Sequence, residues 1–114
     1  MEKFIYLFRD NVSTPNLSPD AMQAHMQKWY EWMQQLLQNG TMLAGEPLET
    51  VGKQVNGTKK TVTDGPFIEA KEMVGGYMIV DAKDMNEAVE ISKGCPIFDT
   101  DGKVEIRPIR KMDM

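Results

Sequence analysis

The stretch that decides the fold is Thr63-Asp64-Gly65-Pro66-Phe67-Ile68-Glu69-Ala70-Lys71-Glu72-Met73-Val74-Gly75-Gly76. Its Asp-Gly-Pro sequence forces a turn, because glycine tolerates positive φ and proline fixes its own φ and has no N–H donor. Charged residues follow the turn, and the glycine pair then opens the most apolar run of the chain. A turn of this kind in the middle of a small domain indicates either a structural corner or the rim of a site.

On both sides of this stretch the sequence predicts β-structure. Residues 76–82 alternate two sets of apolar side chains, so both faces of this strand should be covered, as in the centre of a sheet. Upstream, residues 53–62 place Asn56-Gly57 between two short β-prone segments, which is a strong hairpin signal. We expect this hairpin to protrude, polar and largely exposed.

The remaining segments complete an alternation of strands and helices. They are a strand over residues 4–8, a helix from the Ser18 cap to about Gln38, a strand over 41–48, a helix that begins after Asp84 and stops at Gly94, and an edge strand over 103–109. The order is that of an α+β, ferredoxin-like βαββαβ sandwich with an antiparallel sheet and an inserted β-hairpin. At 114 residues, positions 1–114 form a single domain.

Two helices cover only one face of such a sheet. The strands over 4–8 and 76–82 are apolar on both sides, so an open second face would expose more contiguous apolar surface than monomers usually do. We therefore expect a homodimer joined through the open sheet face.

Composition excludes several classes of partner and cofactor. The chain has 13 basic and 17 acidic residues, which argues against nucleic acid and against an anionic membrane surface. A single cysteine, Cys95, and a single histidine, His25, leave too few ligands for a structural zinc site, and no metal or other cofactor is expected. No segment is long and apolar enough to span a bilayer, and no signal peptide is evident, so a cytoplasmic location is expected.

His25 is the first candidate for chemistry, because histidine is the side chain best suited to proton transfer near neutral pH. The predicted first helix presents one apolar stripe of Met22, Met26, Trp29, Met33, Leu36 and Leu37. His25 lies at the margin of this stripe, either half-buried at a cleft or as an ordinary exposed helix histidine. The ten methionines suit irregular cores and adaptable binding surfaces, and the core interpretation is favoured.

Several residues are candidates to work beside His25. Asp64 either pairs with the imidazole or only forms its turn. The candidates for contact with a ligand are Trp29, Glu46, Glu49, Phe67, Lys71 and Glu72. Trp29 and Phe67 would form an apolar wall and Lys71 would hold an anionic group, although charged residues in such a turn also serve simply as a solvated surface.

Together these motifs resemble the YCII-related, or DGPF-domain, family. The resemblance rests on Thr63-Asp64-Gly65-Pro66-Phe67 with Gly75-Gly76 behind it, and on Gly45-Glu46-Pro47-Leu48, Glu87-Ala88, Cys95-Pro96 and residues 104–109. It implies a dimeric α+β barrel, and an acid–base pair made of a helix histidine, matched by His25, and an aspartate after the second strand. This sequence has no aspartate there, so Glu46, Glu49 or Asp64 would have to replace it.

The prediction for function is therefore a small-molecule enzyme with a His/carboxylate acid–base pair in a cleft at the sheet end, made of His25 and, first among the carboxylates, Asp64. The alternative is a non-catalytic ligand- or partner-binding module with a regulatory role, since the resemblance includes proteins associated with sigma factors. A haem role follows only from analogy with the wider superfamily.

Overall fold

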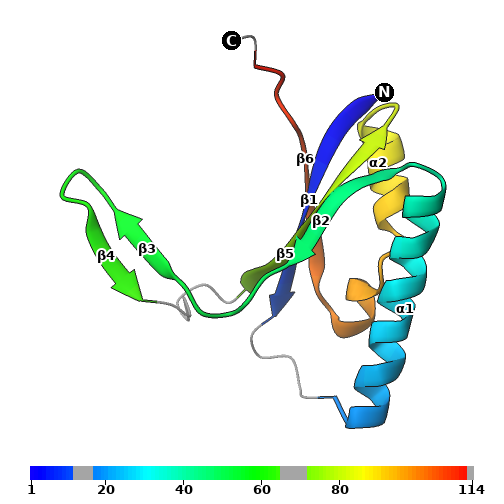
Figure 1. The fold of residues 1–114 in the computed structure, drawn as a ribbon, viewed down its shortest axis with the longest axis horizontal. Coiled ribbons are helices and arrows are strands. Elements are labelled where there is room, and N and C mark those ends of the chain that lie inside the picture. The colour runs from blue at the N-terminus through cyan, green and yellow to red at the C-terminus, as the bar shows by residue number, and fades with distance from the viewer. Residues whose placement is uncertain (12–16, 65–71, 113–114) are drawn as a thin grey trace.

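The computed structural model describes residues 1–11, 17–64 and 72–112. Its elements are β1 (Glu2–Asn11), α1 (Pro19–Gln38), β2 (Met42–Pro47), β3 (Lys53–Asn56), β4 (Thr61–Asp64), β5 (Glu72–Ala82), α2 (Met85–Ser92), the 3₁₀-helix η1 (Pro96–Thr100) and β6 (Lys103–Pro108). Antiparallel pairing gives one sheet in the order β2-β5-β1-β6, and β3 and β4 pair only with each other (Figure 1). The predicted ferredoxin-like α+β fold is confirmed, with β1 and β5 central and β6 at an edge.

Both helices begin where their capping residues predict. The Ser18 hydroxyl accepts a hydrogen bond from the Ala21 N–H at the start of α1 (3.2 Å). The Asp84 carboxylate accepts one from the Glu87 N–H at the start of α2 (2.9 Å). Each cap satisfies a backbone donor that the first helical turn leaves unpaired.

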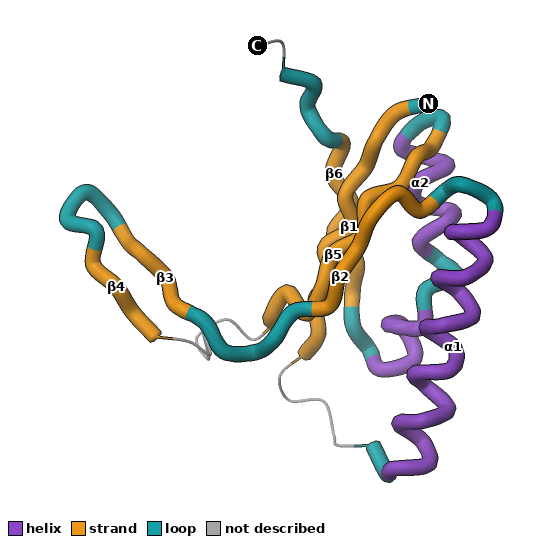
Figure 2. Tube along the Cα trace, in the orientation of Figure 1, coloured by secondary structure: helices purple, strands orange, loops and turns teal. Residues whose placement is uncertain are grey.

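The helices lie together on one face of the sheet, and the core is formed between them and the central strands (Figure 2). The side chains that point toward the helices include Phe4, Tyr6 and Phe8 of β1 and Met78 and Val80 of β5, all of them buried. Because successive strand residues point to opposite faces, the register places Ile5 opposite Ile79 and Leu7 opposite Tyr77 on the open face.

The predicted stripe of α1 is correct only in part. Trp32 and Leu36 are the buried residues of the helix, whereas Leu37 is 48% exposed and Met22 and Met26 are 45% and 58% exposed. Indole rings bury more apolar surface than aliphatic side chains do. Burial of Trp32 turns the helix so that Leu37 points outward.

The central strands are longer than the apolar pattern predicts, since β1 continues to Asn11 and β5 already begins at Glu72. The hairpin turn also differs from a two-residue Asn-Gly turn. Asn56 pairs with Thr61, and the loop between them has positive φ at Gly57 and Lys60. Residues 65–71 of the Asp-Gly-Pro stretch lie outside the described residues.

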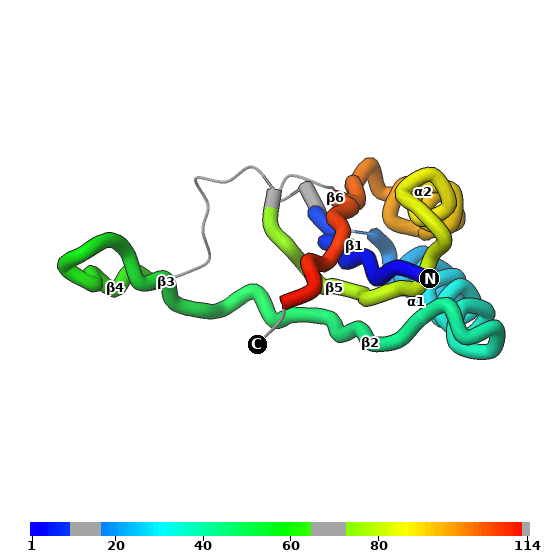
Figure 3. Tube along the Cα trace, turned by 90° about the horizontal axis from the view of Figure 1, so that it is seen from above, coloured from blue at the N-terminus to red at the C-terminus, as the bar shows by residue number. Residues whose placement is uncertain are grey.

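The β3–β4 hairpin stands out from the sheet on the side opposite to the helices (Figures 1 and 3). Its strands contact no other described helix or strand. The molecule measures 48 × 44 × 19 Å, and its radius of gyration of 16.0 Å exceeds the roughly 13 Å of a compact domain of this length. The hairpin is therefore an arm outside the folded body.

Candidate functional site

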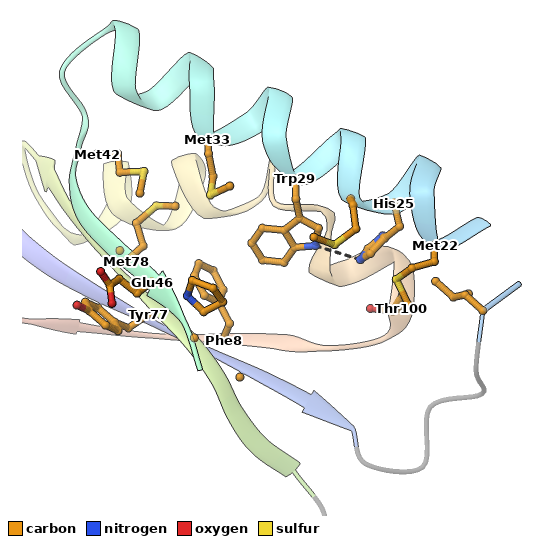
Figure 4. Close-up of a pocket in the computed structure, with 16 residues that line it drawn as sticks. Phe8, Met22, His25, Trp29, Met33, Met42, Glu46, Tyr77, Met78 and Thr100 are labelled. Atoms are coloured by element: carbon orange, nitrogen blue, oxygen red, sulfur yellow. Dashed lines mark hydrogen bonds between the residues drawn. The ribbon is translucent and has the colours of Figure 1, made fainter. Parts of the chain in front are cut away.

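A cavity of about 490 Å³ opens between α1 and the sheet, at the edge where β2 pairs with β5 (Figure 4). Side chains from α1, β1, β2, β5 and η1 line it. They are Phe8, Leu17, Met22, His25, Met26, Trp29, Met33, Met42, Pro47, Met78 and Thr100, and the strand residues Gly45, Glu46, Gly75, Gly76 and Tyr77 complete the wall.

Five of the ten methionines line this cavity, namely Met22, Met26, Met33, Met42 and Met78. The interpretation of methionine as core filler therefore applies to Met78, which is buried, but not to Met22 and Met26, which are exposed above the cavity. Flexible, polarisable thioethers adapt to ligands of different shape. The sequence pattern placed Met22, Met26 and Met33 on one face of the helix but did not show that this face borders a cavity.

A hydrogen bond from Trp29 holds His25 on the cavity wall. The indole Nε1–H donates to His25 Nε2 at 3.0 Å, one helical turn away along α1 (Figure 4). Trp29 is itself fixed by edge-to-face contacts, with its ring centroid 5.2 Å from that of Phe8 and 5.9 Å from that of Trp32. The aromatic core of the domain thus sets the orientation of the histidine.

This bond also determines the chemical form of His25. An indole nitrogen is a donor only, so Nε2 must present its lone pair and the proton of the neutral ring lies on Nδ1. His25 therefore offers an N–H donor at Nδ1. Protonation at Nε2, or attack on a proton of a ligand, requires the bond from Trp29 to break.

The opposite wall is made of closely approaching backbone. A methyl group added to Gly45 would lie 2.9 Å from the carbonyl oxygen of Tyr77 and 3.0 Å from Cε of Met42. One added to Gly76 would lie 3.1 Å from the carbonyl oxygen of Glu46. Glycine at these positions allows β2 and β5 to pair tightly beside the cavity.

Three of the site residues predicted from the sequence line the cavity: the side chains of His25 and Trp29 meet on its wall, whereas Glu46 borders it with its side chain turned to the open face. Glu49 lies exposed in the connection after β2 and is not among the lining residues. Asp64 lies at the end of β4 on the arm, where its carboxylate pairs with Lys53.

Three further candidates belong to the Asp-Gly-Pro stretch. Phe67 and Lys71 lie outside the described residues, and Glu72 is the first residue of β5. Within the described ranges, no group of three or more His, Cys, Asp or Glu side chains is arranged to hold a metal ion. None of the described helices is long and apolar enough to cross a membrane.

With the fold and the cavity defined, the sequence identifies the family. The model of the YCII-related domain matches residues 4–113. The chain belongs to the YCII-related domain family. The family match covers nearly the whole chain, which agrees with the motifs that surround Asp64 and Gly75.

Among solved structures, this YCII-related domain is similar to 5-chloro-2-hydroxyhydroquinone dehydrochlorinase (TftG) from Burkholderia phenoliruptrix AC1100, in complex with 2,5-dihydroxybenzoquinone. The TM-score is 0.51 and the sequences are 15% identical, with 95% of this chain and 93% of that chain covered. The likeness supports the ferredoxin-like fold over the full length of the domain. No curated protein sequence matches the chain significantly.

Proposed function

We propose that this YCII-related protein binds a small planar organic molecule in the cavity beneath α1 and that His25 exchanges a proton with it. The observation that carries the proposal is the bond from Trp29, which holds the single histidine of the chain on the wall of a largely apolar cavity. The cavity volume of about 490 Å³ lies within the roughly 300–1,000 Å³ typical of small-molecule sites. Aromatic rings and thioethers favour a flat, polarisable ligand.

Glu46 borders the cavity with its backbone, but its pairing with Tyr77 turns its side chain to the open face of the sheet, away from α1 and His25. Among the described residues it is the one acidic residue that borders the cavity, whereas Asp64 is engaged by Lys53 on the arm. In Figure 4, Glu46 lies beside Tyr77 on the side of β2 away from α1, whereas His25 lies on the α1 side of the sheet. In this proposal His25 is therefore the group on the α1 side of the sheet that exchanges the proton with the ligand.

The second candidate function, a non-catalytic ligand-binding module, is favoured by one specific observation. The Nε2 lone pair of His25 is already used by Trp29. If that bond persists with ligand present, His25 contributes only the Nδ1–H, which holds a carbonyl or phenolate oxygen. The site would then bind without turnover.

A titration with 2,5-dihydroxybenzoquinone, the compound bound by the dehydrochlorinase of the same fold, separates these functions. Binding is measured by calorimetry, and proton transfer by NMR, as deuterium incorporated from D₂O into carbon-bound positions of the probe. His25→Gln keeps an acceptor for Trp29 and a donor for the ligand but cannot relay a proton. Gln27→Ala is the control, since Gln27 bonds to Glu31 on the exposed face of α1.

For an enzyme we expect the wild type to accelerate the exchange, and His25→Gln to bind the probe but lose roughly 10²–10⁴-fold in exchange rate. For a binding module, wild type and His25→Gln both bind and neither accelerates exchange. Equal affinity of wild type and His25→Ala would remove His25 from the site and overturn both forms of the proposal.

We also propose that two copies assemble through the open face of the sheet. Ile5, Leu7, Tyr77 and Ile79 form its centre, and none of the described helices covers them (Figure 1). Monomers seldom leave a contiguous apolar face of this kind in water. A two-fold dimer would cover it with the same face of a second copy.

A further inference from the structure

The arm, defined here as residues 48–64, carries a hairpin that packs against none of the described helices and strands. A two-stranded hairpin is at best marginally stable alone in water, because ordering its backbone costs about 1–2 kcal/mol per residue and it has no core to offset this. Among the described residues, no surface of this chain supplies that stabilisation.

The two faces of the hairpin differ. Gln54, Asn56 and Thr63 lie on one face and satisfy one another, with the Asn56 amide donating to Thr63 Oγ1 at 3.3 Å. On the other face Val55 lies directly opposite Val62, and these side chains are 63% and 56% exposed. A cross-strand pair of valines stabilises a hairpin by side-chain packing, and it contributes more when another surface buries the pair.

The position of the arm indicates which partner covers the hairpin face that carries Val55 and Val62. The arm leaves the sheet on the side opposite to the helices, which is the side of the open face (Figures 1 and 3). A second copy that covers the open face would thus lie beside the arm. In a two-fold dimer the relation is mutual, so each arm would reach the other copy.

The distribution of charge also favours a second copy of this chain as the partner of the arm. Residues 53–64 carry three lysines and one aspartate, whereas the rest of the chain carries ten basic and sixteen acidic residues. The hairpin is therefore basic and the body acidic. Opposite potentials of this kind guide association and fix its orientation.

We propose that the arm docks on a second copy of this chain, with Val55 and Val62 as its contact face. The inference rests on the proposed assembly through the open sheet face and adds an exchange of arms to it. Val51 and Leu48, both exposed, lie in the connection between β2 and the hairpin. The arm joins the sheet where the Leu48 N–H donates to the Gly75 carbonyl (2.9 Å), beside the cavity wall.

The direct test mixes copies labelled with ¹³C in the valine methyl groups with unlabelled copies. We expect isotope-filtered NOEs from the Val55 and Val62 methyl groups to protons of the unlabelled copy. In sedimentation experiments, the double variant Val55→Asp/Val62→Asp should raise the dimer dissociation constant by roughly tenfold or more, since it buries charges in the interface.

The matched control is Gln54→Asp/Thr63→Asp, which places the same two charges on the neighbouring cross-strand pair of the opposite face. It should change the dissociation constant by no more than about twofold. A dimer without these NOEs, or one weakened equally by both variants, would overturn the docking of the arm and leave the sheet-face dimer intact. A wild-type monomer at tens of micromolar would overturn both. Binding of the quinone probe in the cavity is a separate result that neither outcome decides.

Discussion

The indole of Trp29 fixes the tautomer of His25, and this makes a prediction at the scale of one residue. In the wild type, ¹⁵N NMR of the imidazole should show the proton on Nδ1, because Nε2 accepts from the indole. Trp29→Phe keeps an aromatic ring but removes the donor. We expect the ring of His25 to shift toward the Nε2–H form in this variant.

Gln27→Ala, on the exposed side of the same helix, serves as the control and should leave the imidazole shifts unchanged. An Nε2–H tautomer in the wild type would mean that the bond between Trp29 and His25 does not form in solution. His25 would then be free to act through Nδ1 as an acceptor.

A second prediction concerns Tyr6, whose side chain is fully buried and whose hydroxyl donates to the Ala88 carbonyl of α2. Tyr6→Phe should lower the free energy of unfolding by about 0.5–1.5 kcal/mol, the net contribution of one such bond. Urea unfolding monitored by circular dichroism measures the difference.

The same residue gives a pH dependence. Burial, with a smaller contribution from Cys95, raises the pKa of Tyr6 well above its ordinary value. Above about pH 10 the unfolded chain therefore loses a proton that the folded chain keeps, and stability falls by up to about 1.4 kcal/mol per pH unit. The fall should be smaller in Tyr6→Phe, and equal slopes in the two proteins would assign it to other groups.

Sequence reasoning reached part of this residue-level picture. His25 was a candidate site residue because it is the one histidine of the chain and lies in a predicted amphipathic helix. Trp29 follows four residues later, and residues four apart are neighbours on the surface of a helix. The sequence did not show that the two indoles decide the rotation of α1, which buries Trp32 and leaves Met22 and Met26 above a cavity. That choice depends on packing against Phe8, which is distant in sequence.

At the scale of elements, the junction of β2 and β5 depends on Gly45. A methyl group there would meet the backbone oxygen of Tyr77 at 2.9 Å, and backbone cannot move aside as a flexible side chain does. Gly45→Ala should therefore destabilise the protein by about 1–3 kcal/mol. Gly52→Ala is the control, because a methyl group there meets nothing within 4 Å, and it should be neutral or stabilising by up to about 1 kcal/mol.

Urea unfolding of the two glycine variants against the wild type measures these differences. If Gly45→Ala and Gly52→Ala were equally stable, the close pairing of β2 and β5 would not hold in solution. The effect on probe binding should follow the same order, since Gly45 lines the cavity and Gly52 lies in the arm.

The sequence also predicted which helices and strands exist better than it predicted their detailed shape and direction. The caps at Ser18 and Asp84 mark both helices because the signal is local. Asn56-Gly57 indicated a hairpin, but not its four-residue loop with positive φ at Gly57 and Lys60, nor its direction away from the sheet (Figure 1). Turn residues alone do not contain that information.

At the scale of the whole molecule, the open sheet face predicts a dimer. Leu7→Glu places a charge at its centre and should produce monomers at concentrations where the wild type sediments as a dimer, while circular dichroism remains unchanged. Leu37→Glu makes the same substitution at an exposed site on α1 and should leave the dimer intact. A wild-type chain that is monomeric at micromolar concentration would contradict the assembly.

The fold as a whole followed from the order of the segments, because βαββαβ patterns permit few arrangements of an antiparallel sheet. The position of the cavity did not. The cavity lies where the side chains of α1 leave space above β2 and β5. A change in the volume of a few side chains would decide whether that space is filled or open. Asp64 illustrates this limit, because its family motif is clear in the sequence and its described position is on the arm.

The thioether wall gives the protein a sensitivity to oxidants. Met22 and Met26 are open to solvent, whereas Met78, on the same cavity, is buried in the core. Peroxide would therefore convert the outer two to sulfoxides first, replacing apolar contacts with polar, chiral ones while the fold stays intact. Affinity for an apolar ligand would fall under oxidising conditions and return when a methionine sulfoxide reductase restores the thioethers.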